Sequence, residues 1–401
     1  MSLLKKHNLQ PALIGILALA FLVRIAAMIL LPDQPFPDAR KYVTAATEFR
    51  NFHLMTNTLI MPLYPALIAL VGSGWGKKIA DLALSLVTVW LVYAIALQVY
   101  RREAIALIAA LLAALWPHFV FFAAAGLTET LFITLMLAGL LSFYREHYFL
   151  GSIFMVLSLL TRPALEPLAP FLVLVFALVV HRRPLSFSIG RLAVYAFVYI
   201  GLMSPWWLHN YAKYGEFVRL NTAGGMVLYT GNNPLNRSGG GVGDVDVDLG
   251  PLAKIENPVR RGEAYTRAAL DYIRAEPTHF LSMALVKFAR LWRPWPYVGD
   301  YQNPLIVFIS VASFLPTLGL AIFGLFTTLR SHFRIMLPCL LIIGFLTLVH
   351  MVTFGSVRYR IPLEPFVLIF AAAGVFNIAQ HFAVGRSLLT RFAPSREILV
   401  S

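Results

Sequence analysis

Charged residues are scarce in this chain: Asp, Glu, Lys and Arg make up 13% of its 401 residues, whereas 59% are hydrophobic. Because a soluble globular domain carries about 25% charged residues, this composition excludes one. Aromatic residues alone make up 13% of the chain, and the sequence has no short repeat or heptad pattern, which excludes a disordered chain, a collagen and a coiled coil. The composition predicts a protein that folds within a lipid bilayer.

Cysteine is almost absent as well, because Cys339 is the only one. One cysteine within an apolar run excludes a disulfide framework and a cysteine-rich metal site. His118, His209 and His350 lie near predicted outer helix ends without an HExxH pair and are expected to be structural. The chain also lacks the GxxxxGK[ST] loop and the GxGxxG fingerprint that bind nucleotide phosphates.

What the sequence has instead is a series of apolar runs of about the length that crosses a bilayer. The stretch 59–72 contains Pro62 and Pro65 and is expected to be re-entrant or interfacial. The predicted fold class is an all-α polytopic integral membrane protein with interfacial helices in its first outer loop. The ten expected spans are 12–31, 79–99, 104–121, 127–144, 148–161, 164–180, 190–208, 303–328, 335–353 and 361–380.

The spans divide the chain into three parts. The N-terminal transmembrane module (1–208) contains seven spans and the first outer loop, 32–78. A small mixed outer, periplasmic domain (209–302) follows, and the C-terminal transmembrane module (303–401) ends in a cytoplasmic tail. In the outer domain, a helix capped by Asn257 with Pro258 in its first turn is expected to end before Pro277. Residues 278–293 then predict an amphipathic helix in the outer interface.

The net charge of +14 reflects membrane topology more than binding to nucleic acid. With ten spans and a cytoplasmic N-terminus, the cytoplasmic segments hold more Lys and Arg than the short outer loops, although those loops are longer in total. This bias predicts both termini in the cytoplasm and no nucleic-acid partner. Only Glu103, Glu146 and Glu397 among the acidic residues fall on the cytoplasmic side. Chemistry is therefore expected on the outer face, where ATP and nucleotide sugars are absent.

The first outer loop contains an acidic residue close to the predicted membrane surface. The Asp38 carboxylate is expected to reach both lipid headgroups and water, which suits a general base acting on a lipid-linked substrate. Lys41 and Tyr42 follow one turn later on the same helical face, which places a cation where it can meet a phosphate. The alternative for Asp38 is an N-terminal helix cap, a position that Asp favours.

A second acidic residue is expected at lipid depth, at the outer start of the fourth span. A carboxylate there is costly unless it is paired or bound to a metal, so Glu129 is a candidate site residue. The alternative is that its charge stabilises the helix N-terminus. Arg162 is a candidate for phosphate binding, and an ion pair between Arg162 and Glu166 across Pro163 explains both residues equally well.

Two arginines flank a tyrosine in the short outer turn before the last span. Arg358 and Arg360, on either side of Tyr359, would hold a phosphate through bidentate, charge-assisted hydrogen bonds. The alternative is that they anchor the span at the membrane interface. Arg24, inside the first span, is expected either to extend outward to the headgroups or to point into a polar cavity.

Six short motifs occur in a fixed order along the chain, and Gly215 and Phe217 follow the fourth of them. This ordered set resembles the type C glycosyltransferases, specifically the glycosyltransferase family 39 branch that contains protein O-mannosyltransferases and the bacterial lipid A aminoarabinose transferase. The resemblance covers nearly the whole chain, and its specificity comes from the order of the motifs. They are residues 38–42 (DARKY), 127–129 (LTE), 160–163 (LTRP), 205–211 (PWWLHNY), 231–234 (GNNP) and 358–362 (RYRIP).

The resemblance implies an inverting transfer of a sugar from a polyprenyl-phosphate carrier to an acceptor hydroxyl, on the outer face of a bacterial inner membrane. It implies Asp38 as the catalytic acidic residue, with Lys41 and Arg358 near the donor phosphate. With the residues described above, the expected site has Asp38 and Glu129 as catalytic residues. Lys41, Tyr42, Arg162, Arg358 and Arg360 are expected to bind the donor phosphate, and Tyr359, Asn232 and Asn233 to bind substrate.

The chain departs from the family pattern in two ways. Ala39 follows Asp38 where many relatives carry a second acidic residue, which weakens the inference of a shared metal. A divalent metal ion therefore stays an alternative, not an expected cofactor. The large C-terminal outer domain of some members has no counterpart here, so acceptor recognition is expected from 209–302.

The expected mechanism needs a base and a cationic phosphate site. The acceptor hydroxyl must lose its proton as it attacks the anomeric carbon, and a fixed carboxylate near its ordinary pKa can accept it. Cations stabilise the charge that grows on the leaving phosphate. One alternative is an O-antigen ligase or polymerase that uses a diphosphate-linked oligosaccharide. Another is a transporter or flippase of an anionic lipid-linked substrate, although the inverted repeats and midplane polar residues typical of transporters are not seen in the sequence.

Overall fold

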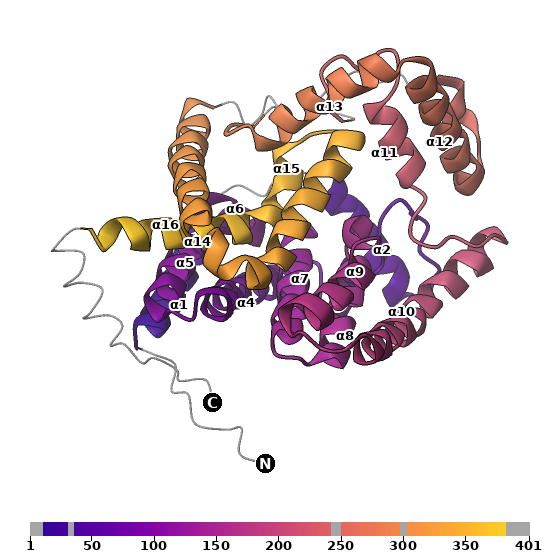
Figure 1. Ribbon diagram of the computed structural model, residues 1–401. Coiled ribbons are helices and arrows are strands. Elements are labelled where there is room, and N and C mark those ends of the chain that lie inside the picture. The colour runs from indigo at the N-terminus through magenta and orange to yellow at the C-terminus, as the bar shows by residue number, and fades with distance from the viewer. Residues whose placement is uncertain (1–10, 31–35, 242–249, 297–302, 382–401) are drawn as a thin grey trace.

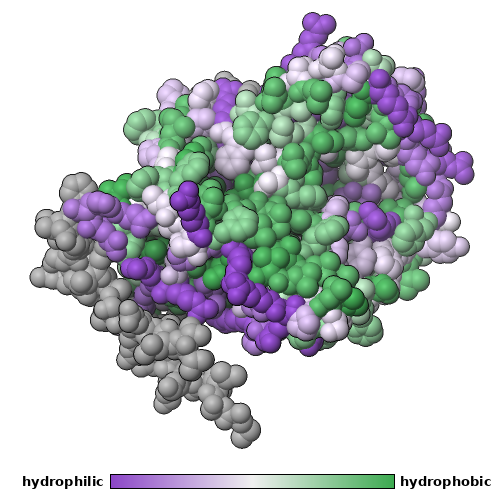
Figure 2. Space-filling model, in the orientation of Figure 1, coloured by the Kyte–Doolittle hydropathy of each residue, from purple (hydrophilic) through white to green (hydrophobic). Residues whose placement is uncertain are grey.

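The computed structural model describes residues 11–30, 36–241, 250–296 and 303–381 (Figure 1). Within these ranges the regular structure is helical and contains no strand, so the predicted all-α class is confirmed. Figure 2 shows hydrophobic residues across the middle of the visible face, with hydrophilic residues along its lower edge and at its upper right. This distribution is what a protein that exposes apolar side chains to lipid requires.

Five helical segments of the described chain are long and apolar enough to cross a membrane, or six if one bent pair counts as a span. Three further apolar helical segments are shorter. The count of ten spans therefore stays a prediction. The long segments are α1 (Pro11–Leu30), α4 (Trp75–Tyr100), α10 (Leu185–Tyr214), α14 (Pro304–Val352) and Val357–Ala379; the bent pair is α5 (Glu103–Leu115) with α6 (Pro117–Ala125); the shorter ones are α7 (Glu129–Tyr144), α8 (Tyr148–Leu159) and Ala169–Val180, which contains α9 (Ala169–Leu174) and η2 (Val175–Val180).

The bend of 50° between α5 and α6 lies at Pro117. Proline has no N–H, so the helix cannot continue its hydrogen bonds across this residue. The buried Arg24 of α1 donates to the carbonyls of Ala114 (2.8 Å) and Ala113 (3.4 Å), at the end of α5, and to Ser85 Oγ (2.7 Å). Arg24 therefore faces the protein interior, where it satisfies carbonyls next to the break, and does not extend to the headgroups.

The largest difference from the predicted spans is α14, which runs as one helix of 49 residues through both 303–328 and 335–353. The expected loop at 329–334 is helical. The polar residues there indicated a loop, but Arg is a good helix former and a helix satisfies its own backbone polar groups. Figure 1 shows that α14 changes direction along its length, so that one helix supplies two arms.

Contacts along α14 place its middle and its C-terminal end beside different parts of the molecule. Tyr144, at the end of α7, donates to the carbonyl of Ile335 (2.6 Å). At the other end, Asn232 of the outer segment donates to the carbonyl of Val352 (2.8 Å). The second arm of α14 therefore ends directly before the short turn for which the sequence predicts a phosphate site.

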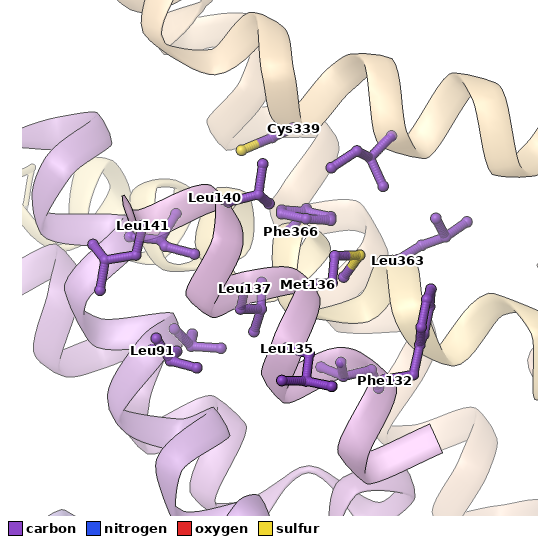
Figure 3. Packing of buried hydrophobic residues seen from close by; sticks show 14 of the residues in the cluster. Leu91, Phe132, Leu135, Met136, Leu137, Leu140, Leu141, Cys339, Leu363 and Phe366 are labelled. Atoms are coloured by element: carbon purple, nitrogen blue, oxygen red, sulfur yellow. The ribbon is translucent and has the colours of Figure 1, made fainter. Parts of the chain in front are cut away.

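The segment Val357–Ala379 contains α15 (Val357–Arg360), η5 (Ile361–Leu363) and α16 (Glu364–Ala379), and it is almost entirely buried. A Cβ at Gly324 of α14 would overlap the carbonyl oxygen of Phe370, and one at Gly374 would overlap that of Leu320. Small residues let helix backbones approach closely within a bilayer. Figure 3 shows Phe366 of this segment among buried side chains of α4, α7 and α14. This packing fixes the helix turn that precedes α16.

The region predicted to be the outer domain, for which we keep that name, contains helices and irregular segments in its described residues, 209–241 and 250–296. Figure 1 shows its helices together at one side of the molecule: α11 (Gly224–Gly231), α12 (Pro258–Ala275) and α13 (Pro277–Trp292). The predicted N-cap of α12 is confirmed, because Asn257 Oδ1 accepts from the backbone N–H of Val259 (2.8 Å). α13 exposes Leu281, Leu285 and Phe288 and buries Lys287 and Arg290.

Candidate functional site

Five charged side chains from four separate parts of the chain meet at one cluster. Asp38 and Lys41 come from the first turns of α2 (Pro37–Arg50). Glu129 is the first residue of α7, and Arg162 lies between α8 and the short helix η1 (Pro163–Leu165). Arg358 comes from α15. The cluster is thus built from residues at helix ends and turns.

Arg358 is the centre of this cluster. Its Nη1 donates to Asp38 Oδ2 (2.8 Å), and its Nε and Nη2 donate to the two oxygens of Glu129 (2.5 and 3.4 Å). Arg162 Nη1 donates to Glu129 Oε1 (2.5 Å), and Lys41 Nζ donates to Asp38 Oδ1 (3.0 Å). The planar guanidinium fork of Arg358 therefore joins two carboxylates that lie 91 positions apart in the sequence.

Exposure increases across the cluster from one side to the other. The Glu129 side chain is completely buried and that of Arg162 is 17% exposed, whereas Arg358, Asp38 and Lys41 are 27%, 35% and 42% exposed. An anion would therefore approach the cluster from the side of Asp38 and Lys41. The buried side, around Glu129, can only support the arginines.

The cluster has one positive charge in excess, since three cations face two carboxylates. Burial alone would raise the pKa of Asp38, but the charges and hydrogen bonds of Arg358 and Lys41 outweigh it and lower this pKa. Asp38 is therefore ionised at neutral pH. A site with partly exposed Lys and Arg and an excess of positive charge suits a phosphate.

The alternative explanations of the two acidic residues do not account for their contacts. The N-cap of α2 is Phe36, and no side chain caps this helix. Asp38 uses its two oxygens for Lys41 and Arg358, so the capping hypothesis is wrong. Glu129 is in the first turn of α7, where its charge also favours the helix, but both its oxygens bind arginine.

Aromatic side chains form part of the surroundings of the cluster. Tyr42 is buried and its ring meets that of Tyr64 edge-on at 5.3 Å. Arg162 lies 5.3 Å from the centre of the Tyr359 ring, which also stacks parallel to the His350 ring at 4.5 Å. His350 was predicted near an outer helix end, but a single histidine has no pattern that would relate it to this cluster.

Arg360 does not join the cluster, although it is two residues from Arg358. It is completely buried, donates to Glu364 Oε1 (3.0 Å) and to the carbonyl of Arg293 (2.5 Å). The same carboxylate accepts from Trp116 Nε1 (2.6 Å) and contacts His118 Nδ1 (2.9 Å). Residues two apart on a helical turn face different directions. The prediction that Arg358 and Arg360 share a phosphate site did not take this geometry into account.

Asn232 and Asn233 are also buried and serve the backbone around them. Asn232 Nδ2 donates to the carbonyls of Leu228 (2.9 Å) and Val352 (2.8 Å). Asn233 Oδ1 accepts from the backbone N–H groups of Leu235 and Asn236 and so stabilises a turn. These side-chain hydrogen bonds do not involve the cluster, so the expected role of both residues in substrate binding gains no support from them.

The predicted ion pair between Arg162 and Glu166 is wrong. Arg162 pairs with Glu129, whereas Glu166 accepts hydrogen bonds from Tyr199 (2.9 Å) and Arg219 (3.3 Å). Within the described ranges no group of three or more His, Cys, Asp and Glu side chains is placed to hold a metal ion. The two carboxylates of the cluster bind cationic side chains.

Comparisons with known proteins add a structural context to this geometry. No protein family model and no curated protein matches the sequence significantly. The oligosaccharyltransferase AglB from Archaeoglobus fulgidus, in complex with an inhibitory peptide and a dolichol-phosphate, matches with a TM-score of 0.56 and 13% identity over 97% of this chain and 52% of that one. ArnT from Cupriavidus metallidurans, bound to undecaprenyl phosphate, matches with a TM-score of 0.53 and 14% identity over 94% and 62%.

The chain spans 52% of the length of AglB and 62% of the length of ArnT. At 13% and 14% identity, these likenesses concern the arrangement of helices and not the side chains. Both neighbours are type C glycosyltransferases. The chain therefore resembles these two proteins in the arrangement of its helices.

Proposed function

We propose that this protein transfers a sugar from a polyprenyl-phosphate carrier to an acceptor hydroxyl, with inversion, at the outer face of a bacterial inner membrane. The observation that carries the proposal is the partly open cluster of Asp38 with Lys41, Arg162 and Arg358, which has positive charge in excess. The two structural neighbours are recorded with dolichol-phosphate and undecaprenyl phosphate, which supports a lipid phosphate as the donor. Both termini are proposed to be cytoplasmic.

The donor phosphate would enter from the exposed side of the cluster and bind Lys41 and Arg358. It would then share the two cations that now neutralise Asp38. Because those cations lower the pKa of Asp38, sharing them with a phosphate would return this pKa towards its ordinary value. Donor binding would thus make Asp38 a better base.

The transfer step forms one bond, breaks one bond and moves one proton. The acceptor oxygen forms a bond to the anomeric carbon while the bond from that carbon to the phosphate oxygen breaks. The electron pair of the broken bond stays on the phosphate, where Lys41 and Arg358 stabilise it. The proton of the acceptor hydroxyl goes to Asp38.

Glu129 has a different role in this proposal from that of Asp38. Its carboxylate is buried and both oxygens are occupied by Arg162 and Arg358. Glu129 therefore orients the two guanidinium groups and does not accept the proton. Tyr42 and Tyr359 supply walls of the site, since each is next to a charged member of the cluster in sequence or in space.

The experiment that tests this proposal uses Asp38→Asn. This change keeps the size of the side chain and removes the proton acceptor, so sugar transfer should fall by about 10²–10⁴-fold. Transfer is measured with purified protein and sugars linked to undecaprenyl phosphate. Asp271→Asn, at an exposed site of α12, is the matched control and should transfer at the unchanged rate.

Three outcomes would contradict the proposal. Unchanged transfer by Asp38→Asn would show that Asp38 isn't the base. Turnover of diphosphate-linked oligosaccharides alone would favour an O-antigen ligase or polymerase. Movement of the lipid-linked substrate across vesicles without any transfer would favour a flippase.

A further inference from the structure

The helical turn that carries Arg358 has little to hold it in place by itself. α15 contains four residues, which is fewer than an isolated helix needs to be stable in water. It follows the turn 353–356, which joins it to α14. The position of Arg358 relative to Asp38 and Glu129 must therefore depend on what this turn packs against. Its neighbours are α13 and the segment 231–241 of the outer domain.

Lys287 of α13 holds the start of this turn. Its side chain is completely buried. Its ammonium group donates to Asn232 Oδ1 (2.9 Å) and to the carbonyl of Val352 (3.4 Å). Asn232 donates to the same carbonyl, so that three elements meet at one oxygen atom.

Arg290, one turn further along α13, holds the middle of the turn. Its Nε donates to the carbonyl of Gly355 (3.0 Å), and its Nη1 donates to the carbonyl of Ser238 (3.4 Å). The N–H of Gly355 donates to the carbonyl of Gly239 (3.0 Å). Arg290 therefore bridges the turn and the outer segment, which are also bonded to each other.

The backbones at this junction approach too closely for any side chain. A Cβ at Gly355 would overlap the carbonyl oxygen of Lys287, and one at Gly231 would overlap that of Thr353. A Cβ at Gly241 would lie 2.5 Å from the ring of Phe354, the residue whose ring meets Tyr359 at 5.3 Å. The turn thus has no free space in which to shift without moving α13.

The buried position is unfavourable for the charge on Lys287. Burial lowers the pKa of this lysine to about 8, and its ammonium group bonds the uncharged oxygens of Asn232 and Val352. Burying a cation without a carboxylate costs free energy. A methionine of similar volume would avoid this cost but could not donate a hydrogen bond. Replacing Lys287 with methionine therefore tests its hydrogen bonds to Asn232 and Val352.

We propose that Lys287 and Arg290 are positioning residues, which hold the turn 353–356 and the end of α14 before it so that Arg358 meets Asp38 and Glu129. The outer domain would then control the geometry of the phosphate site without touching the phosphate. The identity of the ligand in this proposal rests on the proposed function. The effect of Lys287 and Arg290 on the turn does not depend on that function.

The first test measures backbone hydrogen–deuterium exchange of the segment 353–360 in the purified protein. Lys287→Met and Arg290→Met should each increase exchange there by about tenfold, the effect of losing one hydrogen bond. Arg274→Met, on the exposed face of α12, is the control and should leave this exchange unchanged. Unchanged exchange in both α13 variants would overturn the proposal, whatever the ligand is.

If a methionine variant fails to fold, Arg290→Lys replaces it. Lysine keeps the charge but lacks the fork whose Nε and Nη1 each bond one of the carbonyls of Gly355 and Ser238, so a smaller increase in exchange is expected. Equal exchange in Arg290→Lys and the wild type would show that the fork geometry of Arg290 does not hold the turn, and would overturn its part of the proposal.

The second test distinguishes positioning from general destabilisation. Binding of undecaprenyl phosphate is measured for Arg290→Lys, Arg358→Lys and the double variant. If Arg290 acts through Arg358, the double variant should bind no more than about twofold more weakly than Arg358→Lys. Multiplied losses would mean that Arg290 acts separately. If the wild type does not bind undecaprenyl phosphate, the proposed function fails, and the exchange measurement still decides the positioning role.

Discussion

Two clusters of charge lie on either side of Tyr359, and they use the same residue types for different purposes. Around Arg358 the side chains are partly exposed and positive charge is in excess. Around Arg360, Glu364 is completely buried and contacts the guanidinium, Trp116 and His118. The comparison indicates that Arg358 can take part in binding an anion because its cluster is partly exposed and contains an excess cation, whereas Arg360 is completely buried and its contacts lie within the protein.

The largest expected effect is a loss of stability when the buried cluster around Arg360 is disrupted. Arg360→Ala would leave Glu364 buried without its cation, which costs about 3–5 kcal/mol of stability. The measurement is the unfolding of the purified protein in mixed detergent. The double variant Arg360→Met with Glu364→Leu is the control, since replacing both charges with apolar side chains should recover most of the loss.

At the open cluster, Arg358→Ala should lower sugar transfer by about 10²–10³-fold, as expected when one group that stabilises developing negative charge is removed. Arg358→Lys should lose less, because it keeps the charge and loses only the planar fork. Initial rates at saturating donor measure both. Equal losses in the two variants would assign Arg358 to packing and remove the contrast with Arg360.

Salt should affect the two clusters differently. The Debye length is about 3 Å at 1 M salt, so charges at the partly exposed cluster are screened there and those at the buried cluster are not. Binding of undecaprenyl phosphate should weaken by about three- to fivefold between low and 1 M NaCl, in line with partly exposed ion pairs. An unfolding midpoint of Arg360→Ala that rises to the wild-type value in 1 M salt would contradict the assignment of a buried pair.

A pH effect is expected for Lys287, a buried cation of the outer domain that belongs to neither cluster. Its pKa is lowered to about 8 from the ordinary 10.5. Between these two values the unfolded chain binds the proton more strongly than the folded chain, so stability should rise as the pH increases from about 8 to 10.5. Lys287→Met should lack this rise, which thermal unfolding at several pH values would show.

Local patterns predicted local structure well in this chain. Asn257 and Pro258 predicted the start of α12, and Pro277 its end, because helix caps depend on neighbouring residues only. The spacing of Asp38 and Lys41 likewise predicted that they share a helical face, and they form an ion pair. Where the chemistry depends on contacts within one turn, the sequence was sufficient.

Contacts across the chain could not be predicted in this way. Arg358 bonds Asp38 across 320 positions, and no spacing rule relates such residues. The ordered motifs suggested that both belong to one site, but they also included Arg360, whose orientation depends on the packing of α15 and α16. The loop expected at 329–334 was wrong for a similar reason, since tertiary contacts stabilise α14 through its polar middle.

The orientation of α13 has a consequence for the outer domain as a whole. This helix turns Leu281, Leu285 and Phe288 outward and its cations Lys287 and Arg290 inward, the reverse of an amphipathic helix on a soluble protein. Cut free of the membrane modules, residues 209–302 would present that apolar face to water and lose the turn that its cations bind. We therefore expect that the outer domain does not fold independently of the membrane modules, and that acceptors bind at the boundary between lipid and water.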